Sequence, residues 1–255
     1  MSKPTFILAP GAWYPPTAFN PLIEKLSDYT CRTVAFPSIQ QATTVQDLQP
    51  DINSVRTLVE SEADAGHDVI MVLHSWAGLP VCSALDGLSK AEREKDGKQG
   101  GVIRLVFFAG FIPQVGESLI GAFGGAPPPW YVREVENGTV TASDPFWLFF
   151  HDVPDGQEWA ATLRPHAWAT KNAPATSAAY YQIPSSYLLC EEDRAIPMAV
   201  QQLMVDRAQT RGAQIETEKI ATSHSPWLVH PEKVAEYLRR QAGESIYTFS
   251  GMKNT

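Results

Sequence analysis

The chain has 255 residues, 44% hydrophobic and 19% charged, which suits one α/β domain with a sizeable core and excludes a disordered protein. Its net charge of -8 disfavours nucleic acids and anionic membranes as partners, because both would repel the surface at long range. No segment approaches the roughly 20 apolar residues that span a bilayer, and the first strand begins too early for a signal peptide. Three widely spaced cysteines predict free thiols in a reducing compartment, so we expect a cytoplasmic protein.

In the first half of the chain, short apolar runs alternate with segments that have helical spacing. The apolar runs predict buried strands over residues 5–9, 31–36, 69–73 and 102–108. The segments between them predict helices over residues 19–26, 45–64 and 77–85. A polar, charged and glycine-rich stretch predicts an exposed surface loop over residues 89–101.

The same alternation returns in the last third of the chain. Strands are expected over residues 186–190 and 215–220, the second near a sheet edge, and helices over residues 197–211 and 231–240. The residues from about Glu244 onward resemble a tail. Strands that alternate with helices predict a mostly parallel central sheet flanked by helices on both faces.

A segment rich in proline, glycine and aromatic residues interrupts this alternation. We interpret residues 1–112 and 184–255 as an α/β core, and residues 113–183 as an inserted helical cap, or lid, over the carboxyl edge of the sheet. Such a cap would line an apolar pocket for a small-molecule substrate. Most of its aromatic residues would form the core of the cap itself, and a few would face the pocket. The candidate substrate-binding residues are Trp13, Trp130, Phe146, Trp147, Phe150 and Trp168.

Ser75 directly follows a buried strand, within the heptapeptide VLHSWAG. A strand that leads into a His-Ser-bulky-small-Gly turn predicts a tight elbow, which holds the serine hydroxyl at the carboxyl edge of the sheet. The pattern G-x-S-x-G is not met, because Leu73 and Ala77 occupy its two glycine positions. Ala77 is small enough for a close backbone approach, whereas Leu73 leaves open whether the elbow is distorted. An ordinary serine at the end of a strand is the alternative.

A serine becomes a nucleophile when a histidine, oriented by a carboxylate, takes its proton. Among the six histidines, His224 fits this role because it lies between the last strand and the last helix, in a loop that opens at the same edge as Ser75. Asp193 follows the preceding strand at that edge and is the expected carboxylate. Its neighbours Glu191 and Glu192 are the local competitors, and we expect them to be solvated.

The tetrahedral intermediate of acyl transfer needs backbone N–H groups that stabilise its oxyanion. Trp76, the residue after the serine, would provide one. Ala12 would provide the other, because Gly11 lets the first loop approach closely. Taken alone, this loop could be a plain turn. His74 would point away from the serine hydroxyl, and we interpret it as structural.

The chain resembles the α/β-hydrolase superfamily in four segments, namely LAPGAW (8–13), VLHSWAG (72–78), YLLCEEDRAIP (187–197) and Thr222–His224. It is most similar to the small-esterase branch that includes plant methylesterases and hydroxynitrile lyases. The resemblance implies the α/β-hydrolase fold, with Ser75 as nucleophile, Asp193 as acid and His224 as base. The chain order serine, aspartate, histidine is the order that this fold uses.

These observations predict a serine hydrolase that cleaves a carboxylic ester, lactone or thioester of a small apolar or aromatic molecule. A lyase or cyclase that uses the same triad, and a ligand-binding receptor on a hydrolase fold, stay open. The lyases resemble one another in a threonine and a lysine where this chain has Ala12 and Ser225, which disfavours hydroxynitrile cleavage. No motif predicts a metal or another cofactor, and the sequence leaves a homodimer open.

Overall fold

A six-stranded parallel sheet forms the centre of the computed structural model, which describes residues 3–245. Its strands are ordered β2-β1-β3-β4-β8-β9. Their bounds are Thr5–Ala9 (β1), Cys31–Thr33 (β2), Asp68–His74 (β3), Gly101–Phe108 (β4), Ser185–Cys190 (β8) and Ile215–Ile220 (β9). The inner strands are buried on both faces, and this burial explains why they consist of nearly continuous apolar runs. The predicted parallel sheet is confirmed, with β9 at one edge.

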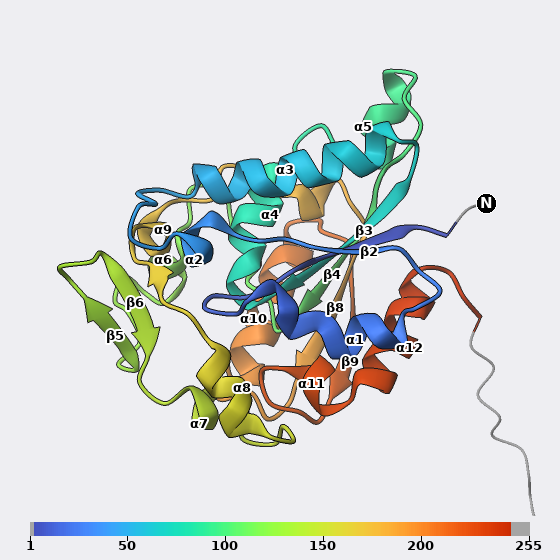
Figure 1. Ribbon diagram of the computed structural model, residues 1–255. Coiled ribbons are helices and arrows are strands. Elements are labelled where there is room, and N and C mark those ends of the chain that lie inside the picture. The colour runs from blue at the N-terminus through green and yellow to red at the C-terminus, as the bar shows by residue number, and fades with distance from the viewer. Residues whose placement is uncertain (1–2, 246–255) are drawn as a thin grey trace, which may run out of the picture.

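Helices cover both faces of this sheet (Figure 1). On one face α3 (Gln49–Asp64) packs against α4 (Gly78–Ala84), and on the other α1 (Asn20–Lys25) packs against α12 (Pro231–Gln241). α10 (Met198–Thr210) packs against β8 and β9. The shorter helices of the core are η1 (Pro16–Phe19), α2 (Pro37–Gln40), η2 (Ser75–Ala77), α5 (Lys90–Lys95) and α11 (Pro226–Val229). None of the helices in the described chain is both long and apolar enough to cross a membrane.

The segment between β4 and β8 contains the predicted insertion and lies at one end of the sheet (Figure 1). It is not wholly helical, because it also holds a small antiparallel sheet, β5-β6-β7. These strands are at most four residues long, too short for an alternating pattern to identify them. The elements are α6 (Leu119–Ala122), β5 (Tyr131–Glu134), β6 (Thr139–Ala142), α7 (Pro145–Phe149), α8 (Gly156–Thr162), β7 (His166–Ala167), α9 (Ala169–Asn172) and η3 (Ala179–Tyr181).

The predicted surface loop over residues 89–101 is wrong, because α5 lies within it. Ser89 caps this helix in a capping box. Its hydroxyl oxygen accepts a hydrogen bond from the Glu92 N–H, and the Glu92 carboxylate accepts one from the Ser89 N–H. Arg93 is buried, and its guanidinium donates to Gly100 O at 2.8 Å and to Asp64 Oδ1 at 2.6 Å. Most of the segment is exposed, as predicted, but part of it is a helix that Arg93 anchors to the core.

The three cysteines are free thiols, as predicted. Cys82 and Cys190 are buried, whereas Cys31 is partly exposed. Burial raises the pKa of the Cys31 thiol to about 11, so this thiol is a poor nucleophile near neutral pH. The predicted C-terminal tail lies almost entirely outside the described residues.

Candidate active site

Ser75 lies at a sharp turn between β3 and α4. β3 ends at His74, and Ser75 begins η2 with φ +53°, a left-handed conformation that residues other than glycine rarely adopt. The Phe111 N–H donates to Ser75 O at 2.9 Å, which ties the turn to the loop after β4. Leu73 and Ala77 are fully buried within this arrangement. The strand-to-helix elbow therefore forms without glycine at either position.

The tightest backbone approach in the elbow is at Gly78, whereas the sequence predicted it at Ala77. A Cβ on Gly78 would collide with the carbonyl oxygen of Phe111. We expect Gly78→Ala to lower the free energy of unfolding by about 3 kcal/mol, because backbone on both sides must move. Thermal unfolding measures this, with Gly121→Ala as control, whose Cβ would meet nothing closer than Ser118 Oγ at 3.3 Å. Equal melting temperatures for the two variants would contradict the prediction.

Asp193 and His224 form a buried pair at the carboxyl edge of the sheet. His224 Nδ1 donates to Asp193 Oδ2 at 2.7 Å, and the two side chains are 2% and 0% exposed. The other carboxylate oxygen accepts the N–H groups of Ala195 and Ile196 at 2.8 and 2.9 Å. These bonds hold the carboxylate in one orientation, and the carboxylate in turn holds the imidazole so that Nε2 is its free nitrogen.

Ser75 and His224 are not joined by a hydrogen bond among the described residues. Catalytic hydrogen bonds are often long before substrate binds, so their absence does not remove Ser75 from the site. Glu191 and Glu192 are both exposed, as expected of solvated neighbours of Asp193. The structure thus brings together the histidine and the carboxylate that the sequence predicted.

Gln201, in α10, holds the Asp193 loop and was not predicted. It is fully buried, and its Oε1 accepts the Cys190 N–H at 3.0 Å. Its Nε2 donates to Asp193 Oδ2 at 3.3 Å and to Ile196 O at 2.7 Å. One amide therefore bonds to both ends of the loop and to the carboxylate. No sequence pattern distinguishes it from the adjacent Gln202.

His74 connects two parts of the site, although the sequence indicated only a structural role. The Gly11 N–H donates to His74 Nδ1 at 3.1 Å, and His74 Nε2 donates to His224 O at 3.0 Å. Complete burial lowers the pKa of His74 well below its usual value, so the ring is neutral and can accept at one nitrogen while it donates at the other. One imidazole therefore joins the first loop to the backbone of His224.

The first loop lies directly against the elbow. A Cβ on Gly11 would be 2.7 Å from His74 Nδ1 and 2.9 Å from the Cβ of Ser75. Glycine at this position is therefore required for the close approach that the sequence predicted. Ala12 is buried, and its N–H donates to no acceptor among the described residues. This leaves the Ala12 N–H available beside the serine.

Two of the six candidate substrate-binding aromatic residues are buried near the pair. The Trp13 ring stacks on Phe149 at 5.6 Å, and its indole N–H donates to Val140 O at 2.8 Å. Phe150 is fully buried, with its ring 6.0 Å from that of Phe149. Phe149, which was not predicted, lies 5.5 Å from the His224 ring. It is one of two adjacent phenylalanines, and the sequence does not distinguish which of them faces the histidine.

The other four candidates lie farther out in the insertion. Trp130 is partly buried against Trp13, with ring centroids 5.9 Å apart. Phe146 is also partly buried. Trp147 is 50% exposed and carries the Arg194 guanidinium over its ring at 4.9 Å. The guanidinium of Arg133, in β5, lies over the Trp168 ring, 4.2 Å from its centre.

A second serine–histidine pair lies in the interior. Ser38, in α2, is bonded to His166 Nε2 at 2.8 Å, and Lys171 Nζ lies 2.6 Å from His166 Nδ1. Because the lysine donates to Nδ1, Nε2 carries the ring proton and cannot accept one from the serine. This pair therefore lacks the proton acceptor that a nucleophilic serine needs.

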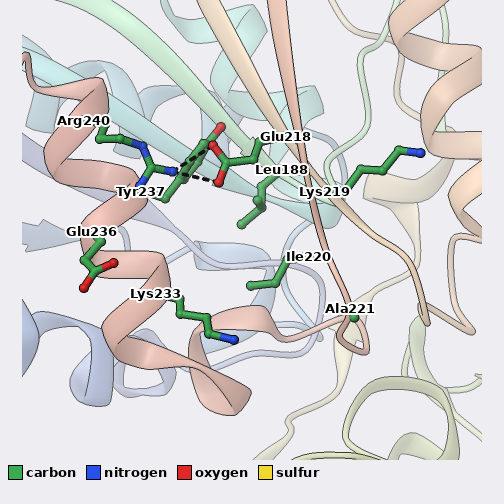
Figure 2. A pocket seen from close by; sticks show the side chains of 9 residues that line it. All are labelled: Leu188, Glu218, Lys219, Ile220, Ala221, Lys233, Glu236, Tyr237 and Arg240. Atoms are coloured by element: carbon green, nitrogen blue, oxygen red, sulfur yellow. Dashed lines mark hydrogen bonds and ion pairs between the residues drawn. The ribbon is translucent and has the colours of Figure 1, made fainter. Parts of the chain in front are cut away.

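Two further features could hold a ligand. His151, Asp152 and Glu192 place one potential metal-ligand atom each within 4.8 Å of one another. A cavity of about 270 Å³ lies between β9 and α12, and the ion pair of Arg240 with Glu218 lies on its wall (Figure 2). This cavity is lined by none of the predicted site residues.

Comparisons with known proteins agree with this architecture. A model of the alpha/beta hydrolase family matches residues 6–237. The chain is 30% identical to alpha/beta hydrolase nvfD of Aspergillus novofumigatus, over 96% of this chain and 99% of that protein. Polyneuridine aldehyde esterase superposes with a TM-score of 0.74 at 14% identity, over 94% of this chain and all of the other. The methylesterase MES16 from Arabidopsis superposes with a TM-score of 0.68 at 18% identity, over 94% and 99% of the two chains. On its sequence and its fold, the chain belongs to the α/β-hydrolase family.

Proposed function

We propose that this α/β-hydrolase is a serine hydrolase that cleaves a carboxylic ester, lactone or thioester of a small apolar or aromatic molecule. The observation that carries the proposal is the buried Asp193–His224 hydrogen bond of 2.7 Å, whose histidine backbone is bonded to His74, the residue before a serine held at φ +53°. A strained, buried nucleophile elbow beside an oriented imidazole is an arrangement suited to acyl transfer. The esterases among the structural neighbours are consistent with the same chemistry.

In the proposed reaction, Ser75 Oγ attacks the carbonyl carbon while His224 Nε2 takes the hydroxyl proton. Asp193 accepts the Nδ1 proton in a hydrogen bond and stabilises the imidazolium. The N–H groups of Ala12 and Trp76 stabilise the oxyanion of the tetrahedral intermediate. The leaving alcohol or thiol takes the proton from His224, and an acyl-enzyme remains. Water then repeats the sequence and releases the acid.

The apolar surroundings support a small apolar or aromatic substrate. Trp13, Phe149 and Phe150 are buried close to the catalytic pair, and such rings favour flat or hydrophobic groups. Ser225, directly after His224, bonds to the Tyr14 hydroxyl at 2.8 Å. This position, which is a lysine in the hydroxynitrile lyases, is therefore a buried neutral residue, and hydrolysis is favoured over cyanohydrin cleavage.

Labelling with a fluorophosphonate tests the proposal. We expect the native protein to be labelled and Ser75→Ala to remain unlabelled, because the reagent reacts only with an activated serine. Ser38→Ala is the matched control, since its hydroxyl is bonded to a histidine that cannot take its proton, and it should be labelled like the native protein. A folded native protein without label would contradict the proposal and favour a binding module. Product analysis with esters and lactones then separates hydrolysis from lyase or cyclase chemistry.

A further inference from the structure

Lys171 carries a buried amine that is bonded to no carboxylate among the described residues. Its side chain lies in α9 with no exposed surface, and among the described residues its amine is hydrogen-bonded to His166 alone. Burial lowers the pKa of its amine well below the usual value. Because an isolated buried ammonium group is costly, burial favours the uncharged amine, and a bound anion would favour its protonated form.

One hydrogen-bonded chain leads away from Lys171. Nζ donates to His166 Nδ1 at 2.6 Å, and His166 Nε2 donates to Ser38 Oγ at 2.8 Å. The Ser38 N–H donates to Asp51 Oδ1 at 3.0 Å. Every donor in this chain points from the lysine toward the aspartate. The chain uses one N–H of the amine and leaves the rest of its donors for a different acceptor.

These remaining donors lie beside the residues of the proposed oxyanion hole. Lys171 Nζ is 4.8 Å from the centre of the Trp76 ring and 5.4 Å from that of Trp13. Trp76 follows Ser75, and Trp13 follows Ala12, so the amine contacts one side chain from each of the two loops of the proposed oxyanion hole.

Trp76 contributes a second unused donor. Its side chain is 1% exposed, and its indole Nε1 has no hydrogen-bond partner among the described residues. A buried N–H without an acceptor costs about 1–3 kcal/mol. The Lys171 amine and the Trp76 indole therefore lie together, and each has an N–H group for which no described residue provides an acceptor.

We propose that Lys171 and Trp76 Nε1 bind a carboxylate of the substrate, so that the enzyme acts on esters or lactones that carry a second, free carboxyl group. This inference rests on the proposed hydrolase function. A carboxylate supplies two oxygens, one for each donor, and its charge neutralises the buried ammonium. Binding at this position would hold the substrate beside the oxyanion donors and orient its ester carbonyl toward Ser75.

Two esters that differ only in charge test the proposal. Phenyl hydrogen adipate carries the free carboxylate, and in phenyl methyl adipate a methyl group caps it. We expect the native enzyme to favour the acid-bearing ester in kcat/KM. Lys171→Met should lower kcat/KM on that ester about tenfold or more beyond any loss on the diester, mainly through KM, because hydrogen bonds to charged groups are strong. Trp76→Phe, which removes only the indole N–H and keeps an aromatic ring, should show a several-fold effect of the same kind.

Controls separate this proposal from the hydrolase function itself. Lys219→Met removes an exposed lysine of β9 and should leave both esters unaffected. Equal losses on the two esters in Lys171→Met and Trp76→Phe would overturn the carboxylate site and assign these residues to support of the oxyanion loops. Absence of fluorophosphonate labelling would instead contradict the hydrolase. Calorimetry of phenyl hydrogen adipate with Ser75→Ala then tests the site without catalysis, since binding should weaken about tenfold when Lys171→Met is added.

Discussion

Asp193→Asn is expected to lower kcat by about 10⁴-fold while KM changes little. An asparagine can still accept the N–H groups of Ala195 and Ile196, which bond to Oδ1 at 2.8 and 2.9 Å, so the loop keeps its shape. The atom that faces His224 Nδ1 at 2.7 Å would become a donor or a neutral acceptor. The imidazole then loses either the tautomer that accepts the serine proton or the charge that stabilises the imidazolium.

Steady-state kinetics on a phenyl ester measure this effect, together with the rate of fluorophosphonate labelling. Both should fall, because both require the proton of Ser75 to move to His224. Glu192→Gln is the matched control, since it makes the same chemical change on an exposed neighbour and should keep kcat within a few-fold. A loss of less than tenfold in Asp193→Asn would show that this carboxylate does not orient the base.

The central sheet and the positions of the three triad candidates were accessible from the sequence for a common reason. Buried parallel strands are continuous apolar runs, and a loop that follows such a strand must open at the carboxyl edge. Ser75 and Asp193 each follow such a run, and His224 follows the alternating edge strand Ile215–Ile220, so their shared edge can be inferred without knowledge of distances. The same reasoning located Gly11, because a glycine directly after a strand indicates close backbone contact.

The roles of the residues that support the site could not be predicted from the sequence, because these roles depend on long-range packing. Gln201 lies in the middle of a helix, and only the fold shows that it faces the Asp193 loop. Lys171 lies in a polar stretch of the insertion, where a lysine is normally solvated. Helix α5 has a sequence signature in its capping box, but the charged and glycine-rich composition of the segment favours a loop. The strands β5, β6 and β7 are too short to leave a periodic pattern.

His74→Phe is expected to lower kcat/KM about 100-fold and the free energy of unfolding by about 2–4 kcal/mol. Phenylalanine fills most of the space but leaves the Gly11 N–H and His224 O without partners, and each unsatisfied buried group costs about 1–3 kcal/mol. The loop that presents Ala12 and the backbone of His224 would then be free to shift relative to Ser75, and small displacements of catalytic groups are costly. His74→Gln, whose amide offers both a donor and an acceptor, should recover part of the activity.

The pH dependence of stability gives the same variant a sharper test. Because the pKa of His74 in the folded protein is far below that of the unfolded chain, the unfolded state binds one more proton below about pH 6.5. The contribution of His74 to stability is therefore complete at pH 7–8 and decreases as the pH falls, by up to about 1.4 kcal/mol per pH unit. Urea unfolding at pH 8.0, 6.5 and 5.5 measures the free energy of unfolding of the native protein and of His74→Phe. The difference between these two free energies should become smaller as the pH falls. A constant difference for His74→Phe would mean that the ring is not held neutral between Gly11 and His224, and that the loss of activity has another cause.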